Sequence, residues 1–173
     1  MPHPLVTQLR FARSELQRGL AGLPAEDAVR RLQPLNCISW MIGHLADQEQ
    51  RYWLIGAQNK TLVPDLTALV GFGQPASTPP LAEVWAYWEA ITQAADPYLD
   101  SLTPEILQTH LVHDGQTHPE NIGTMLQRTL YHYWFHIGEA MAVRQMLGHT
   151  DLPQFVGALG AKAPYRVEKM TEE

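Results

Sequence analysis

Hydrophobic residues recur at steps of three or four in four long stretches of the chain, the period of a helix buried along one side. The first stretch contains Leu5, Leu9, Ala12, Leu16, Leu20 and Leu23. Polar side chains, Arg13 among them, stand between these positions. We therefore expect an amphipathic helix that ends near Gly22, followed by a short helical turn over residues 24–32.

The same period predicts three further helices, at residues 36–56, 78–97 and 121–147. Asn36 and Asn121 are suitable N-caps for the second and the fourth, because an asparagine side chain accepts hydrogen bonds from free amides. The third is predicted to start after a Thr-Pro pair and to bend or end at Pro97. A Leu-Gly pair at 147–148 is typical of a helix C-terminus.

The connections between these helices carry their own signals. Residues 57–80 are rich in proline and glycine, and we expect one helical turn at 65–70. So long a connection is usually functional, such as a lid, or else crosses between distant helix ends. The Asp114-Gly115 pair predicts a small hairpin within 109–118. The pattern predicts an all-α four-helix bundle with short accessory helices.

Composition limits the organisation and the partners. A chain of 173 residues is most simply one domain, with a core at about 5–150 and an extension at 151–173. We expect the extension to pack loosely and its last residues to be disordered. The net charge is −6 and no basic cluster occurs, which argues against nucleic acid or an anionic membrane as partner.

Cysteine content and hydropathy indicate the compartment. The one cysteine, Cys37, excludes an intrachain disulfide and is expected to be a buried small hydrophobe. The sequence shows no signal-peptide core and no apolar run of 18 residues. We therefore expect a cytoplasmic protein.

Two helices carry candidate metal ligands. His132 and His136 are four residues apart, so they lie one turn apart on the same helix face, and Glu139 shares that face. A buried histidine pair without metal is the alternative at this point. On the second helix His44 lies on one face together with Trp40, Gln48 and Arg51. His44 alone is more often an ordinary core or surface histidine than a ligand.

Three further histidines surround the predicted hairpin: His110, His113 and His118. Residues that alternate along a strand do not converge as an i,i+4 helical pair does. Exposed loop histidines are therefore favoured over a second metal cluster. His118 is the one that we expect to overhang a site on the adjoining helix.

Two bundle metal motifs are absent. The di-iron bundles use Glu-x-x-His pairs, and this sequence contains none. The zincin motif needs a glutamate after the first histidine, whereas Tyr133 follows His132. What remains is one histidine within the second helix and a His-x-x-x-His pair on the fourth.

This combination resembles the DinB-like (YfiT-like) superfamily of four-helix-bundle metalloproteins. The resemblance rests on Gly43-His44-Leu-Ala-Asp-Gln-Glu49, on His132-x-x-x-His136-Ile-Gly138-Glu-Ala and on Arg144-Gln145-Met-Leu-Gly148, and covers roughly residues 5–150. It implies that His44, His132 and His136 bind one divalent ion. Family members often carry glutamine where this chain has Glu139, which leaves open whether Glu139 is a fourth ligand.

The resemblance also implies a function. Members of the family include thiol S-transferases, so we expect an ion, zinc or nickel first and iron next, that activates a thiol or a water for attack on a small electrophile. Glu139 is the candidate catalytic residue, and Trp40, Gln48 and His118 are the candidate substrate-binding residues. The expected partners are a small-molecule substrate and a low-molecular-weight thiol, and a homodimer is also expected. A non-catalytic sensor or store and a metal-free structural bundle are the alternatives.

Two glycines lie beside the candidate ligands within the predicted helices. Gly43 and Gly138 each cost about 1 kcal/mol relative to alanine in a helix interior. Glycine is tolerated where two backbones approach closely. We therefore predict that the second and fourth helices meet at these glycines.

Overall fold

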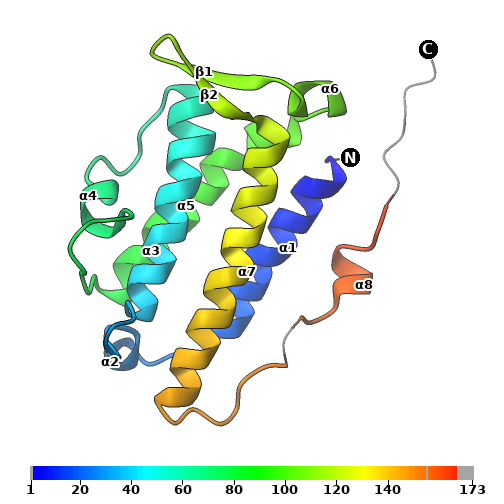
Figure 1. The fold of residues 1–173 in the computed structure, drawn as a ribbon. Helices are drawn as coiled ribbons and strands as arrows, with labels where there is room; N and C mark the ends of the chain where they lie inside the picture. The colour runs from blue at the N-terminus through cyan, green and yellow to red at the C-terminus, as the bar shows by residue number, and fades with distance from the viewer. Residues whose placement is uncertain (1, 155, 167–173) are drawn as a thin grey trace.

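Four long helices lie side by side in the computed structural model, which describes residues 2–154 and 156–166 (Figure 1). They are α1 (Pro4–Leu20), α3 (Ile38–Glu49), α5 (Leu81–Asp100) and α7 (Ile122–Met146). A π-helix, η1 (Gln50–Gly56), continues α3 without a break. The predicted all-α bundle is confirmed: α3 packs mainly on α5, α1 packs on α7, and α3 also contacts α7.

Short elements occupy the ends and one side of the bundle. They are α2 (Ala25–Ala28), α4 (Leu66–Val70), α6 (Pro104–Leu107), β1 (His110–His113), β2 (Gln116–Asn121) and α8 (Leu159–Lys162). The strands pair antiparallel, and Asp114 and Gly115 form the turn with positive φ angles of 49° and 73°. The hairpin crosses one end of the bundle and α2 lies at the other (Figure 1).

The helix ends differ in detail from those predicted. Asn121 caps α7 as expected, because its side chain accepts a hydrogen bond from the amide of Thr124. The N-cap of α3 is Cys37 rather than Asn36. Helix α5 starts after Pro80 and passes through Pro97 to Asp100, so Pro97 does not end it. The buried side chains of Ala95 and Leu99, on either side of the proline, keep this last turn against the core.

One buried polar network joins all four long helices. Arg13 of α1 donates two hydrogen bonds to the carboxylate of Glu49 on α3, which is fully buried. The hydroxyl of Tyr133 on α7 donates to Glu49 at 2.7 Å, and the indole N–H of Trp88 on α5 donates to Tyr133 at 2.7 Å. The pattern placed Arg13 on the polar side of its helix, and that placement is wrong because the ion pair buries it.

The two glycines do not bring α3 and α7 together. A Cβ on Gly43 would meet Val70 at 3.1 Å and Val84 at 3.3 Å, so this glycine admits the side chains of α4 and α5. A Cβ on Gly138 would meet nothing within 4 Å. The predicted close approach is wrong, because the space at Gly43 is taken by valine side chains rather than by a second backbone.

The C-terminal extension returns along α1 (Figure 1). The amide of Gly157 donates to Glu15 at 2.8 Å, and the side chain of Gln8 donates to the carbonyl of Ala163 at 2.8 Å. The disorder expected for the last residues concerns 167–173, which lie outside the described residues. Among the helices of the described chain, none combines the length and the apolar character that a membrane span needs.

Candidate metal centre

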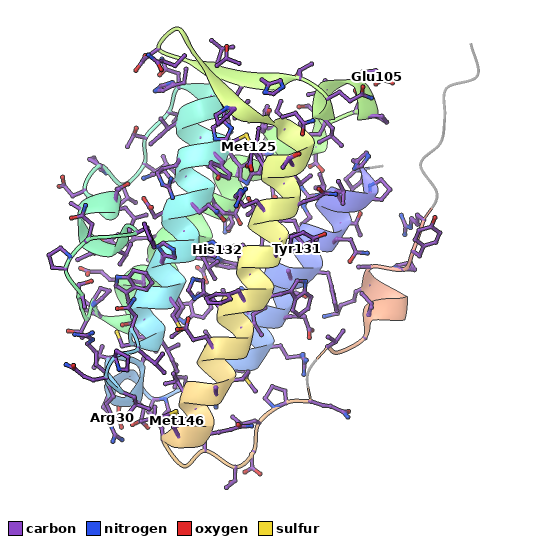
Figure 2. The ribbon with its side chains drawn as sticks, viewed as in Figure 1. Arg30, Glu105, Met125, Tyr131, His132 and Met146 are labelled. Carbon is purple, nitrogen blue, oxygen red and sulfur yellow. The ribbon has the colours of Figure 1, made fainter. Side chains whose placement is uncertain are left out.

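The bundle brings together the three histidines that the sequence singled out. His44 comes from α3, and His132 and His136 come from α7. One ring nitrogen from each lies within 4.8 Å of those of the other two. His132 lies about halfway along α7, on the side that faces α3 (Figure 2). Nitrogens bound to one zinc ion at 2.0–2.1 Å lie at most about 4.2 Å apart, so a small side-chain rotation suffices for all three to reach one ion.

Each of the three imidazoles donates its Nδ1 hydrogen to an oxygen. His44 donates to the carbonyl of Val70 at 2.8 Å, His132 to the side-chain oxygen of Gln48 at 2.9 Å, and His136 to the carboxylate of Glu139 at 2.8 Å. A carbonyl or carboxylate oxygen can only accept, so these bonds assign the hydrogen to Nδ1. In the neutral form of each ring the lone pair is therefore on Nε2, which is the arrangement of histidines that bind metal.

Two of these lone pairs face each other. The Nε2 atoms of His132 and His136 are 3.0 Å apart. Two Nε2 atoms bound to one ion at 2.0–2.1 Å would lie about 2.9–3.4 Å apart for bond angles between 90° and 109°. Two unprotonated nitrogens at this separation repel each other unless a proton or a cation lies between them.

The electrostatics of the centre disfavour a proton on His132. Burial, followed by the neighbouring imidazoles of His136 and His44, lowers the pKa of His132 to about 3. Burial also lowers the pKa of His44. Both rings are therefore neutral near pH 7, with lone pairs available to a cation. Neutral imidazoles suit zinc, nickel and iron, so the residues present fit a divalent ion.

The other candidate residues take different places around the centre. Glu139 accepts a hydrogen bond from Nδ1 of His136, on the edge of the ring opposite Nε2. Its carboxylate therefore contacts a candidate metal ligand and does not point to the place where the ion would bind. Gln48 has the equivalent place behind His132. The indole of Trp40 stacks on His44 with the ring centroids 4.4 Å apart and forms a wall of the centre.

The hairpin histidines are not brought to the centre. His118 packs edge-on against Tyr52 and lines a separate cavity of about 480 Å³ beneath the hairpin. His110 donates through Nδ1 to the carbonyl of His118, within the hairpin itself. In the described residues, the structure contains one cluster of possible metal ligands, and it excludes these histidines.

The long connection at residues 57–80 supports the centre. Its helix α4 packs on α3 and ends at Val70, whose carbonyl holds His44. Thr67 of the same helix donates to Asp47 on α3. The connection thus fixes one candidate ligand, while it also crosses from the end of η1 to the start of α5.

A cavity of about 870 Å³ opens beside the histidines. Its lining residues are His44, Gln48, Arg51, Tyr52, Phe72, Thr124, Gln127, Arg128, Tyr131, His132 and Phe135. Sequence reasoning assigned no role to Arg51, Tyr131 or Phe135. The signal was present for Arg51, which continues the helix face of His44 and Gln48, and for the two aromatics, which each precede a candidate ligand by one residue.

Comparison with known proteins agrees with this all-α bundle and its three-histidine cluster. The sequence matches the model of the DinB superfamily over residues 8–140. The chain therefore belongs to the DinB superfamily. No curated protein sequence matches it significantly.

Proposed function

We propose that the protein is a metal-dependent enzyme in which His44, His132 and His136 hold one divalent ion through Nε2. The observation that carries this proposal is the convergence of one ring nitrogen from each of three histidines within 4.8 Å, with two Nε2 atoms 3.0 Å apart, in rings whose Nδ1 atoms are all hydrogen-bonded. Such an ion lowers the pKa of a bound thiol or water and so supplies a nucleophile at neutral pH. Zinc or nickel is our first choice of ion, and iron is next.

The reaction proposed is thiol transfer to a small electrophile, with hydrolysis as the second choice. The thiol gives its proton to solvent, its sulfur forms a bond to the electrophilic carbon, and the bond from that carbon to the leaving group breaks, so the leaving group departs with the electron pair. The 870 Å³ cavity beside His44 and His132 is large enough for a small organic substrate. This cavity favours an enzyme over a closed metal store.

The surrounding residues are proposed to orient the ligands. Val70, Gln48 and Glu139 each fix the ring plane and tautomer of one histidine. Glu139 forms with His136 the carboxylate–histidine pair that often stands behind a metal ligand, because its carboxylate accepts the Nδ1 hydrogen. Its expected role as a general base stays a prediction, as do the substrate contacts of Trp40, Gln48 and His118, the homodimer and the cytoplasmic location.

Metal analysis joined to a turnover screen tests this function. The purified protein should contain about one divalent ion per chain, and the loaded protein should consume a low-molecular-weight thiol in the presence of an alkylating electrophile. His132→Ala should lose both properties. A loaded protein that gives no turnover with any thiol or water substrate would support the sensor or store, and a metal-free protein would contradict the proposal altogether.

A further inference from the structure

The cavity beside the histidines is lined by arginines and by no acidic residue, although the chain as a whole is acidic. Of its eleven lining residues two are arginines, Arg51 and Arg128, and none is an aspartate or glutamate. The net charge of the protein is −6. A positively lined cavity in an acidic protein favours an anionic ligand.

The two arginines differ in the edge of the guanidinium that is left free. Glu120 engages Arg128 through both Nε and Nη2. Arg51 uses only its Nε, which donates to the buried carboxylate of Asp47 at 3.0 Å. Within the described part of the chain, the terminal Nη groups of Arg51 make no hydrogen bond, while the bond to Asp47 fixes the plane of the guanidinium.

The guanidinium of Arg51 acts on the same space as the candidate ligands. Arg51 follows His44 by seven residues and Gln48 by three, so the three share a face of the helix that runs from α3 into η1. Its positive charge is among the causes that lower the pKa of His44 and His132, after burial. A group bound to Arg51 would therefore lie near the proposed ion.

The rest of the wall is aromatic and open. Phe72 is 91% exposed, Tyr131 65% and Phe135 66%. Tyr131 and Phe135 are one turn apart on α7, and Phe72 belongs to the connection that follows α4. Exposed aromatics that line one cavity offer flat apolar surface to a ligand.

We propose that this cavity binds a small organic carboxylate, with its carboxylate on the Nη groups of Arg51 and its apolar body against Tyr131, Phe135 and Phe72. One guanidinium with free donors matches a singly charged, planar carboxylate. A phosphate ester would need the second arginine, which Glu120 occupies. The proposal rests on the proposed function, since it names the substrate class of the same site.

Binding of matched probes to the metal-loaded protein tests the proposal. We would compare 3-phenylpropionate, its neutral amide and phenyl phosphate by calorimetry. The carboxylate should bind at least about tenfold more tightly than the amide, the effect of one charge-assisted bidentate contact, and more tightly than phenyl phosphate. Equal affinity for carboxylate and amide, no binding of the carboxylate, or preference for the phosphate would overturn the proposal.

Two variants remove the same charge from the same cavity. Arg51→Gln should abolish the preference for the carboxylate and leave the amide affinity unchanged. Arg128→Gln is the matched control, and it should change either affinity less than about threefold because Glu120 already pairs with its charge and engages Nε and Nη2. An equal loss of the carboxylate preference in both variants would show that the preference comes from general electrostatic attraction, and it would overturn the contact with Arg51.

A second substitution at Arg51 controls for the fact that Arg51→Gln also removes the ion-pair partner of Asp47. Arg51→Lys keeps a positive charge beside that carboxylate but lacks the planar fork, so it should lose about threefold or more of the carboxylate preference. Retention of the full preference would overturn the bidentate contact. A carboxylate preference in a protein that binds no metal would leave this inference standing while the proposed function fails, so the two failures are distinguishable.

Discussion

The Nε2 atoms of His132 and His136 face each other at 3.0 Å, one turn apart on α7. A hydrogen bond at Nδ1 holds the opposite edge of each ring. His132 donates to Gln48 on α3, and His136 donates to Glu139, one turn further along α7. These Nδ1 hydrogen bonds keep both rings close to this orientation. The pair is therefore oriented for a cation before any cation binds.

Loss of one ligand should remove the ion and leave the fold. His132→Ala should lower metal affinity strongly, yet its helical circular dichroism should equal that of the wild type. The hydrophobic core does not depend on the centre, and a chain of 173 residues needs no metal to fold. Loss of helical signal in the metal-free protein would show that the site is structural.

The oxygen behind His132 should matter for metal affinity. Gln48→Ala should lower the affinity about 10–100-fold, because the Nδ1 hydrogen of His132 loses its acceptor. Gln127→Ala is the control, since Gln127 lines the same cavity without a hydrogen bond to a histidine in the described chain. A competition titration against a chelator measures both, and equal affinities would refute the role of Gln48.

The charge of Glu139 should affect turnover. Glu139→Gln keeps an acceptor for His136 but removes the negative charge. Turnover should therefore fall much more than metal content. Steady-state kinetics normalised to bound metal decide this, and unchanged turnover would leave Glu139 with a purely structural hydrogen bond.

Stability of the metal-free protein should fall in mild acid. The pKa of His132 is about 3 in the folded chain and about 6.5 when unfolded. Between these values the unfolded chain binds more protons, so the stability present above pH 6.5 is lost as the pH falls toward 3. Between pH 7 and pH 5 the wild type should lose at most about 2 kcal/mol more than His132→Gln in urea unfolding. Equal losses would contradict the shifted pKa.

The buried ion pair should dominate the polar contribution to stability. Glu49→Gln leaves the buried charge of Arg13 with one acidic partner, the partly exposed Asp96. This substitution should lower the free energy of unfolding by about 3–5 kcal/mol. Arg10→Ala is the control on the same helix, and it should cost less than about 1 kcal/mol because Arg10 and its acidic partners are all partly exposed to water. Similar losses in urea unfolding would show that the buried network contributes nothing special.

The sequence predicts local features of the fold well. Apolar residues at helical spacing locate all four long helices, and Asn121 and the Asp114-Gly115 pair mark a cap and a turn that the structure contains. Contacts between distant segments are not encoded locally. The pairing of Arg13 with Glu49, 36 residues away, is one such contact, and the valines that fill the space at Gly43 are another.

At the site, too, the sequence predicts the local features and not the contacts between distant segments. The spacing of His132 and His136 predicts one helix face, and Glu139 is within reach of His136 by sequence alone. The third histidine came from a family resemblance, because no local rule relates α3 to α7. The acceptors Gln48 and Val70 and the free donors of Arg51 depend on how α3, α4 and η1 pack, so they emerge only from the three-dimensional structure.

Anomalous scattering from a crystal of the metal-loaded protein tests the central claim most directly. The account predicts one strong peak about 2.0–2.1 Å from the Nε2 atoms of His44, His132 and His136 if the ion is zinc. A peak at the hairpin histidines, or no peak among these three rings, would contradict it.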